Sequence, residues 1–597
     1  MFDTYHAAMT SLKRSVVRLI VVLALLVPGG TAGAEPDVTF TGSGWGDGVG
    51  LSQYGAKAMG ADGATYREIL NRYFTGMTVG PPSTVAADTF LVTDPTPLWV
   101  GLIQHSDTVS FTIDSGSARL CFDDPDLCIA TAAEGETWRF GPDAEGGCAF
   151  LRQSHDGAWV VVGAPLRCSA SVQAATSQTT VAIPFKARSY RGGTLRFRRA
   201  PTTGKIHTVL EIGVEDYMKG ISAVPESWAS STIEAQVVAS RSNALWNALD
   251  RGAETTFDAS RREECHCNLY DSSPDQVFRG YTGESGHPNW VTAVISTTQQ
   301  VMGFSGSVAL GLFSSSSGGW TESYSDVFGD TAHPYLVSVN DSAAFSDSAA
   351  NPHAVWGASS DQSVLALTFG FSWVSDVAVT ERNDSGSART VAITGIRSGQ
   401  PATALVDAVD VRSALSLRST TFDVTVIPRF GDVPTDHLFA GEVVGLNALG
   451  ITSGCTSVDF CPDRSVTRAE MAAFLVRALD LPTASGDPFG DDDGHALEAE
   501  IASLAASGIT SGCSATSFCP GRAVTRGEMA AFLVRGFDLA AATGTPFSDV
   551  DGNFFEAEIA SLAASGITSG CLATSFCPGR AVTRGEMAAF LIRAIDG

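Results

Sequence analysis

The chain alternates between strand-like and helix-like patterns of hydrophobic positions. From residue 81 to about 170, apolar and polar side chains alternate, as at residues 108–113, between glycine- and aspartate-rich turns. This period of two is typical of half-buried strands, so we expect a β-rich accessory region there. Residues 190–195, 206–212 and 377–396 carry similar strand patterns.

A long helix is predicted shortly after residue 230. Apolar residues recur at near-helical spacing between Ile233 and Ala248, and Ser231 with Glu234 forms an S-x-x-E capping box. Residues 290–298 carry a second helical pattern. We therefore expect helices beside strands in the middle of the chain.

The C-terminal part, residues 429–597, contains three copies of one unit. The glycines of three Gly-Cys pairs, Gly454, Gly512 and Gly570, lie 58 residues apart. Each copy has two helical patterns, and the second opens with a Thr-Arg-x-Glu capping box. A C-x₅-C pair lies between the helices, and we expect local disulfides within the pairs Cys455 and Cys461, Cys513 and Cys519, and Cys571 and Cys577.

The length and the first residues indicate an exported protein of several units. A chain of 597 residues exceeds one core, so we expect three or four units. The first 34 residues combine three basic side chains, an apolar run at 19–27 and an A-x-A site, which predicts a signal peptide cleaved after Ala34. A transmembrane anchor is the alternative, but the run is short of the roughly 20 apolar residues that a span needs.

The net charge argues against one class of partner, and the cysteine content indicates disulfides. The net charge of −26 disfavours nucleic acid, which needs a basic surface. Twelve cysteines in an exported chain favour disulfides. Cys121 with Cys128 and Cys148 with Cys168 is a plausible pairing, although four cysteines permit three connectivities.

Glu226 is a candidate general acid. It lies between Pro225 and Trp228, just before the predicted helix. A carboxyl fixed by a proline and shielded by an indole has surroundings that favour such a role. An acidic residue near a helix start is also typical of a surface group that complements the helix dipole, and the residues alone favour this second interpretation.

Two segments rich in small residues are candidates for binding. The glycines at 40–56 suit a backbone that turns sharply or lies against a ligand. A flexible linker is the alternative, but linkers rarely hold Trp45, Gln53 and Tyr54 at fixed places. Residues 313–322 combine hydroxyls with paired glycines, which can admit a sugar close to the backbone; an ordinary polar turn is the alternative.

These segments together resemble the SpoIID/LytB family. Residues 40–56 are similar to its GWGHGVGMSQYGA signature, residues 216–241 to its glutamate turn and helix, 275–280 to DQ-x-Y-x-G, and 313–322 to SSSGG-x-T-E. The resemblance implies a peptidoglycan lytic transglycosylase with Glu226 as the catalytic acid. It also implies substrate contacts by Trp45, Gln53, Tyr54, Gln236, Arg241, Ser315, Ser316, Ser317, Gly318 and Gly319.

The chain departs from the family pattern in two places. Asp47 stands where the family commonly has histidine, so a metal or proton-transfer role of that histidine does not carry over directly. The glycine-rich segment comes first in the chain, whereas many members place it after the core.

Cys265, His266 and Cys267 are candidate zinc ligands. Some SpoIID relatives bind zinc near this point, and the donor types suit Zn²⁺. The C-x-C spacing is tighter than the usual C-x₂₋₄-C, so thiols paired elsewhere or a strained bridge are the alternatives. The implied reaction requires no cofactor.

The three C-terminal copies resemble S-layer homology (SLH) repeats, whose ITRAE motif is matched by VTRAE or VTRGE. The resemblance implies an all-α-type pseudo-trimer that binds cell-wall polysaccharide. Capping alone accounts for the threonine and glutamate, which leaves Arg468, Arg526 and Arg584 as the candidate ligands.

We therefore expect an α+β SpoIID-like core with a β-rich insertion, followed by the SLH pseudo-trimer. The expected segments are a signal peptide (1–34), a glycine-rich segment (35–80), an accessory region (81–175), the core (176–428) and repeats at 429–482, 483–540 and 541–597. We expect a secreted, wall-associated lytic transglycosylase that acts on peptidoglycan glycan strands. The alternative is a non-catalytic peptidoglycan-binding enhancer of a cell-wall amidase.

Overall fold

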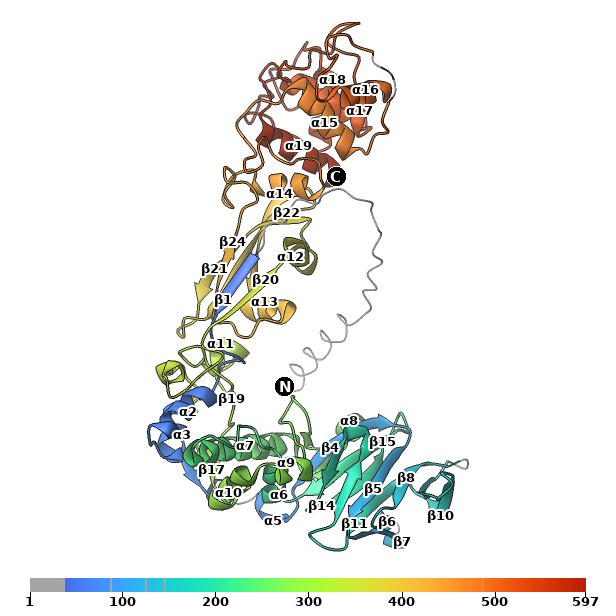
Figure 1. Ribbon diagram of the computed structural model, residues 1–597, viewed down its shortest axis with the longest axis vertical. Helices are drawn as coiled ribbons and strands as arrows, with labels where there is room; N and C mark the ends of the chain where they lie inside the picture. The colour runs from blue at the N-terminus through green and yellow to red at the C-terminus, as the bar shows by residue number, and fades with distance from the viewer. Residues whose placement is uncertain are drawn as a thin grey trace.

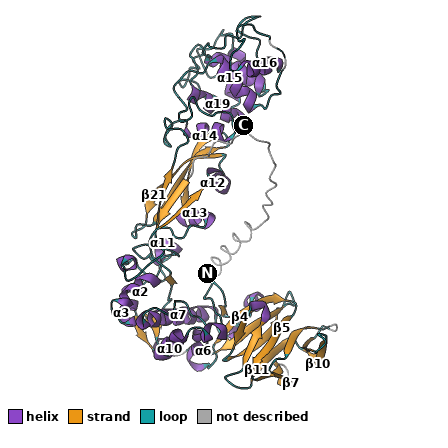
Figure 2. Ribbon diagram, in the orientation of Figure 1, coloured by secondary structure: helices purple, strands orange, loops and turns teal. Residues whose placement is uncertain are grey.

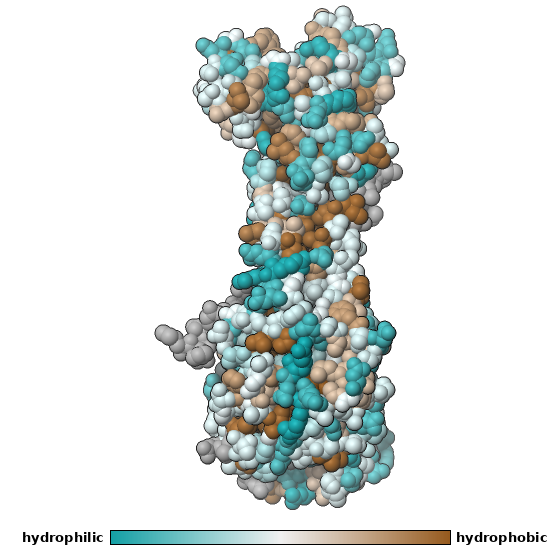
Figure 3. All heavy atoms as spheres, turned by 90° about the vertical axis from the view of Figure 1, so that its left-hand side faces the viewer, coloured by the Kyte–Doolittle hydropathy of each residue, from teal (hydrophilic) through white to brown (hydrophobic). Residues whose placement is uncertain are grey.

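The computed structural model describes residues 38–596 apart from 86–88, 124, 125, 144, 145, 485 and 487. The predicted signal peptide, residues 1–34, lies outside the described residues. The molecule is elongated, with a lower body, a narrower stalk and a C-terminal head (Figure 1, Figure 3). Helices and strands are mixed in the body and the stalk, whereas the head is built from helices and loops (Figure 2).

Two large sheets form one side of the lower body. The first has the order β16 (Leu269–Tyr270), β4 (Leu98–Ser106), β15 (Ile206–Ile212), β14 (Gly193–Arg199), β11 (Ser169–Ala174), β6 (Ser117–Asp123) and β7 (Asp126–Ala133). The second has the order β10 (Trp159–Leu166), β9 (Cys148–Gln153), β8 (Thr137–Pro142), β5 (Val109–Ser115), β12 (Thr180–Ile183) and β13 (Arg188–Tyr190). Their inner faces share a buried core, in which the rings of Phe140 and Phe197 stack 4.6 Å apart.

The strand prediction for the accessory region is confirmed. In β5, Val109, Phe111 and Ile113 are buried, as the alternation requires. The expected boundary at residues 175 and 176, however, runs through a single sheet, because the first sheet takes β4, β6, β7 and β11 from one side of it and β14, β15 and β16 from the other. Disulfides join Cys121 to Cys128 and Cys148 to Cys168, which is the pairing that we considered plausible.

Helices form the other side of the lower body around α7 (Ser230–Arg251). They are α2 (Gln53–Ala61), α3 (Tyr66–Tyr73), α6 (Val214–Lys219) and α10 (Pro288–Ser296), all in contact with α7. Short elements complete this part: α4 (Pro82–Val85), α5 (Phe90–Thr93), α8 (Ala259–Glu264), α9 (Tyr281–Ser285), α11 (Tyr324–Phe328), β2 (Leu51–Ser52), β3 (Thr78–Gly80), β17 (Val301–Phe304), β18 (Ser307–Val308) and β19 (Phe313–Ser314).

The start of α7 differs from the prediction. The helix is present and its apolar positions are buried, but its N-cap is Ala229, which makes no side-chain capping bond. The predicted Ser231–Glu234 capping box is therefore wrong, because the helix has already begun at Ser230. Glu234 instead accepts a hydrogen bond from the hydroxyl of Ser296 at 2.7 Å, which ties α7 to α10.

The stalk brings the first described strand beside the last strand of the expected core. β1 (Val38–Gly42) lies between β20 (Trp356–Ser360) and β24 (Phe422–Val426), antiparallel to both. A second sheet holds β21 (Trp373–Arg382), β22 (Ala388–Arg397) and β23 (Gln400–Asp407), and it packs with α12 (Gln362–Phe369) and α13 (Ala408–Leu415) in one buried cluster.

The head contains three similar copies with two helices each. The helices are α14 (Ala440–Ala448) and α15 (Arg468–Ala478), α16 (Glu498–Ala506) and α17 (Arg526–Gly536), and α18 (Glu556–Ala564) and α19 (Arg584–Asp596). They pack between copies, α15 against α16, α17 against α18 and α19 against α14. The three predicted capping boxes are present, and so are the three predicted disulfides, Cys455–Cys461, Cys513–Cys519 and Cys571–Cys577.

Backbone hydrogen bonds link the three copies in a closed cycle. The N–H of Val524 donates to the carbonyl of Val466, that of Val582 to Val524, and that of Val466 to Val582, each at 2.9 Å. None of the helices in the described part of the chain has the length and apolar character that a membrane crossing needs.

Candidate functional site

Glu226 lies in the turn between α6 and α7, and its carboxylate caps a third helix, α10. Its Oε2 accepts from the backbone N–H of Asn289 at 2.6 Å, and its Oε1 accepts from that of Trp290 at 3.0 Å. The side-chain amide of Asn289 donates to the carbonyl of Glu226 at 3.0 Å. The first N–H groups of a helix lack partners within the helix, so a carboxylate there is stabilising. Glu226 thus makes the dipole-complementing contact, at α10 rather than at α7.

The glycine-rich front segment packs against α7 and against residues 313–322. β2 pairs in parallel with β19, and the N–H of Tyr54 donates to the carbonyl of Ser315 at 3.1 Å. The side-chain amide of Gln53 donates to that of Gln236 at 3.2 Å, and the hydroxyl of Thr232 donates to the carbonyl of Ala56 at 3.1 Å. The segment therefore lies against the core that carries Glu226, despite its distance along the chain.

Two glycines allow this close approach. At Gly44 the backbone has φ 88°, and a Cβ would meet the backbone nitrogen of Gly318 at 2.8 Å. At Gly50, with φ 76°, a Cβ would meet the carbonyl oxygen of Leu312 at 2.3 Å. Any side chain at these positions would push the two segments apart.

The predicted substrate residues are partly brought together. Trp45 is 47% exposed, Tyr54 is half-buried, and the ring of Tyr54 lies 5.3 Å from that of Trp228 in the Glu226 turn. Gln236 is buried, and its amide donates to Ser240. Arg241 is fully buried and forms an internal ion pair with Glu215 at 2.7 Å.

The serines at 315–317 hold the front segment. Ser316 pairs with Trp45 through backbone hydrogen bonds in both directions, and Ser316 and Ser317 are 1% and 2% exposed. Gly318 and Gly319 have φ values of 88° and 119°. A sugar contact through these serine hydroxyls stays a prediction, because the structure uses Ser317 internally, as a donor to Asp341.

Asp341 is a central residue that the sequence does not point to. Its carboxylate accepts from the hydroxyls of Tyr73 at 2.6 Å and Ser317 at 2.5 Å, and the side chain is 2% exposed. Burial raises the pKa of this carboxyl, while the bond from Ser317 opposes the increase. A lone aspartate without characteristic spacing gives no signal in the sequence.

Asp47, where the family commonly has histidine, faces the stalk. Its carboxylate accepts from Arg412 of α13 at 2.5 Å, and its side chain is largely exposed. The substitution thus creates an ion pair between the front segment and the stalk.

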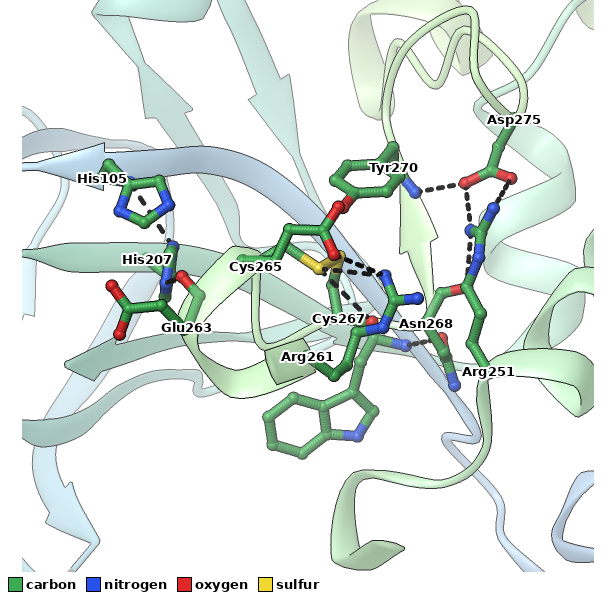
Figure 4. The surroundings of a disulfide bond; sticks show 12 residues. His105, His207, Arg251, Arg261, Glu263, Cys265, Cys267, Asn268, Tyr270 and Asp275 are labelled. Atoms are coloured by element: carbon green, nitrogen blue, oxygen red, sulfur yellow. Dashed lines mark hydrogen bonds and ion pairs between the residues drawn. A yellow bond between two sulfur atoms is a disulfide. The ribbon is translucent and has the colours of Figure 1, made fainter. Parts of the chain in front are cut away.

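Cys265 and Cys267 are joined in a disulfide (Figure 4). A disulfide between these two cysteines is one of the alternatives to a zinc site given above. Sulfurs bonded to each other are not the thiolates that bind zinc. The imidazole of His266 lies 3.0 Å from Glu254 and pairs with it. Elsewhere in the described part of the chain, Asp491 lies close to Cys513 and Cys519, but those sulfurs also form a disulfide.

Arg468, Arg526 and Arg584 lie between the copies of the head. They are 3%, 2% and 2% exposed. Each Nε donates to a carbonyl of another copy, that of Phe518, Phe576 and Phe460 respectively, and each Nη1 pairs with a glutamate there. The arginines therefore join the repeats, and burial leaves little of them for a wall polymer.

Comparisons with known proteins agree with these features. The family model described as stage II sporulation protein (SpoIID) matches residues 202–304, which hold the Glu226 turn, α7 and α10. The S-layer homology domain model matches residues 488–530 and 546–588, the second and third copies. The chain contains a SpoIID domain and S-layer homology repeats. The first copy repeats the fold of the two SLH matches in the head.

Similar proteins share short regions with this chain. An S-layer protein of Bacillus thuringiensis subsp. finitimus is 30% identical over 171 residues, 28% of this chain and 21% of that protein. A surface-layer 125 kDa protein of Lysinibacillus sphaericus is 32% identical over 138 residues, and an endoglucanase of Bacillus sp. (strain KSM-635) is 35% identical over 110. The chain spans 21% of the first relative and 12% of each of the others. The SLH repeats and the S-layer relatives indicate a cell-wall-associated surface protein.

Proposed function

We propose that the SpoIID domain is a lytic transglycosylase that cleaves peptidoglycan glycan strands between N-acetylmuramic acid and N-acetylglucosamine. The observation that carries this proposal is the packing of the glycine-rich segment against the Glu226 turn. Two segments that resemble SpoIID signatures and lie far apart in the sequence thereby meet at the turn that carries Glu226, where Tyr54 contacts Trp228 and Gln53 donates to the carbonyl of Ala223. The exposed ring of Trp45 and the half-buried ring of Tyr54 supply aromatic surface on the front segment.

Glu226 acts in both steps of the proposed reaction. As an acid it protonates the glycosidic oxygen that leaves. As a carboxylate it then removes the proton of the sugar's own 6-hydroxyl, which closes a 1,6-anhydro ring. No water has to be activated, so a second carboxylate is not needed. A carboxylate has about four lone-pair directions, so the two N–H bonds at α10 leave room for a sugar.

Product analysis tests this proposal. Digestion of purified glycan strands by the full chain should release fragments with 1,6-anhydro ends, detected by mass spectrometry. Reducing ends would indicate a hydrolase, and the absence of any cleavage would contradict the proposal.

The second candidate function is a non-catalytic one, in which the domain binds peptidoglycan and enhances a cell-wall amidase. The capping contact favours it, because stabilising α10 alone accounts for the position of Glu226. In that case a Glu226 variant that folds should keep the stimulation of an added amidase, and no anhydro ends should form.

The head is proposed to be an SLH pseudo-trimer that binds cell-wall polysaccharide. The closed cycle of hydrogen bonds among the three copies supports this arrangement. Residues 429–597 alone should sediment with cell-wall sacculi and remain in solution with sacculi stripped of their polysaccharide. Equal sedimentation with both would indicate binding to peptidoglycan itself.

A further inference from the structure

Four rings form a continuous row from the Glu226 turn to the edge of the stalk. The ring of Trp228 lies 5.3 Å from that of Tyr54, and Tyr54 lies 5.5 Å from His353. His353 in turn lies 4.6 Å from the ring of Trp45. The four residues come from three distant segments of the chain, so the fold assembles this row.

His353 is the link in the row, and the loop around it is fixed. Its carbonyl accepts from the N–H of Gly44 at 2.8 Å, and its own N–H donates to the side chain of Asn351 at 2.9 Å. The amide of Asn351 donates to the hydroxyl of Ser316 at 3.0 Å. Burial, and then the charge of Arg418, lower the pKa of His353, so the ring is neutral near pH 7. A neutral imidazole adds ring surface to the row without adding charge.

Arg418 supplies an available cation at the outer end of the row. Its guanidinium lies 5.1 Å from the centre of the exposed Trp45 ring. The side chain is exposed, and among the described residues it has no hydrogen-bond or ion-pair partner. A second cation beside the row, Lys57, is half-buried and uses one of its three N–H groups to donate to the carbonyl of Ala349 at 2.6 Å. Arg418 is the more exposed of the two cations, and all five of its guanidinium N–H groups can face a ligand.

We propose that Arg418 and His353 extend the glycan site into a row that selects carbohydrate chains bearing carboxylate groups. The ring faces pack against sugar rings, and the guanidinium binds a carboxylate through paired N–H groups. A neutral carbohydrate of the same backbone can pack against the rings, but it has no carboxylate for the guanidinium to bind. This inference rests on the proposed function, since it assumes that the row binds a glycan.

Binding of two probes to the full chain tests the inference. The first probe is a soluble glycan strand of alternating N-acetylglucosamine and N-acetylmuramic acid, freed of wall polysaccharide, which carries carboxylates. The second is a chitooligosaccharide of equal length, which carries none. Isothermal titration calorimetry with each probe compares four chains that all carry Glu226→Gln, so that the strand is bound but not cleaved. They are the otherwise wild-type chain, called the wild type in this comparison, and its variants Arg418→Gln, His353→Ala and the control Arg389→Gln, an exposed arginine of β22 in the same stalk.

The wild type should bind the carboxylate-bearing strand more tightly than the chitooligosaccharide. Arg418→Gln should weaken the first by about tenfold, the size of one charge-assisted hydrogen bond, and leave the second nearly unchanged. His353→Ala should weaken both, because it removes ring surface, and Arg389→Gln should change neither. Added salt should reduce the wild-type preference.

The outcomes separate this inference from the proposed function. If the wild type binds neither probe, the glycan site itself fails. If it binds both but Arg418→Gln changes neither affinity, or lowers both equally, the selection of carboxylates is wrong while glycan binding stands. If His353→Ala leaves both affinities unchanged, His353 is not part of the row.

Discussion

The carboxylate of Glu226 holds two backbone N–H groups of α10, and an amide cannot replace it there. In Glu226→Gln one of these donors faces an NH₂ group, which is itself a donor. We expect the variant to lose about 1 kcal/mol of free energy of unfolding, in addition to the loss of anhydro ends that the proposed function requires. Urea unfolding of wild type and variant measures the difference.

Glu234→Gln is the matched control for this change. Glu234 is a neighbouring half-buried glutamate, and its partner is the hydroxyl of Ser296. A hydroxyl can rotate to accept as well as donate, so the amide is tolerated at this position. Equal stability of Glu226→Gln and the wild type would show that the capping contact contributes little.

His207 makes the stability of the lower body depend on pH. It is fully buried in β15, its Nδ1 accepts from the N–H of His105, and its Nε2 donates to the carbonyl of Glu263. Burial, and then the nearby His105 ring, lower its pKa from 6.5 to about 4. The folded state thus keeps the ring neutral where the unfolded chain already binds a proton.

Because the pKa of His207 is lower in the folded than in the unfolded chain, the folded state becomes less stable as the pH falls. Above pH 6.5 the His207 ring is neutral in both the folded and the unfolded chain, so its contribution to the free energy of unfolding is fully present. This contribution is lost as the pH falls from 6.5 to about 4. The loss amounts to roughly 3 kcal/mol at most, at 1.36 kcal/mol per pKa unit. Urea unfolding at pH 7.5 and pH 4.5 should show a smaller difference for His207→Gln than for the wild type. Identical differences would contradict this role.

Residue roles could be predicted from the sequence where they depend on neighbours in the chain. The head disulfides and the Thr467–Glu470 capping box are local, and both are present. Roles that depend on burial could not be predicted. Arg468 and Ser316 look like ligands in sequence, yet the fold places both inside interfaces. Asp341, His353 and Arg418 carry no local signal, since tertiary packing alone brings them to the site.

The arginines at the starts of α15, α17 and α19 join elements of different copies of the head. Arg526 donates to the carbonyl of Phe576 at 2.7 Å, pairs with Glu586 at 3.2 Å and lies over the ring of Phe576. In Arg526→Ala the carbonyl of Phe576 loses its donor, and the half-buried Glu586 keeps only Arg580 and its capping bonds with Thr583. We expect a loss of about 2 kcal/mol in the free energy of unfolding of the head, because the buried carbonyl is left without a donor and the packing of the arginine is lost. Thermal and urea unfolding of residues 429–597 measure it.

Arg522→Ala is the control for this variant. Arg522 pairs with Glu528, but its side chain is 45% exposed, so its loss should cost less than about 1 kcal/mol. If both variants unfold like the wild type, the arginines of the helix starts do not hold the copies together. Loss of wall binding by Arg526→Ala with unchanged stability would instead restore its role as a ligand.

The elements themselves were largely predictable, but their grouping was not. The alternation at 108–113 and the helical spacing from Ile233 gave the correct element types, since each period reflects one buried face. Strand pairing joins residues far apart in the sequence, so the sheet that spans the expected boundary at 175 and 176 left no local signal. The capping box at Ser231 is absent because the helix already begins at Ser230, and Glu234 contacts Ser296 of α10 instead.

At the scale of the whole molecule, the front segment contacts both the stalk and the lower body. β1 completes the stalk sheet, and Phe40 packs edge-on against Phe422 with ring centres 5.5 Å apart. Val49 and Leu51 share a buried cluster with Ala235 and Val238 of α7. One segment therefore joins the stalk to the lower body and supplies Trp45 and Tyr54 to the site.

The position of this segment in the chain should consequently be exchangeable. Val38 pairs with Val426 in the antiparallel β1–β24 ladder, so the start of β1 lies beside the end of β24. A two-residue Asn-Gly turn can join such ends. We compare three chains that all lack the repeats: residues 38–428, residues 81–428, and residues 81–426 followed by Asn-Gly and residues 38–80. The truncated chain should lose glycan cleavage and cooperative unfolding, because the stalk sheet and the α7 cluster are both left open, and the rearranged chain should regain both.

A substitution within the rearranged chain tests whether residues 38–80 must pack against the fold or need only be part of the chain. Phe40 is fully buried, so Phe40→Asp should prevent β1 from docking and return the chain to the behaviour of the truncated one. Urea unfolding followed by tryptophan fluorescence, together with assay of anhydro ends, gives both readouts on each chain. If residues 81–428 unfold as cooperatively as residues 38–428 and still cleave glycan, the front segment is a separate appendage, and the shared site with Glu226 is wrong.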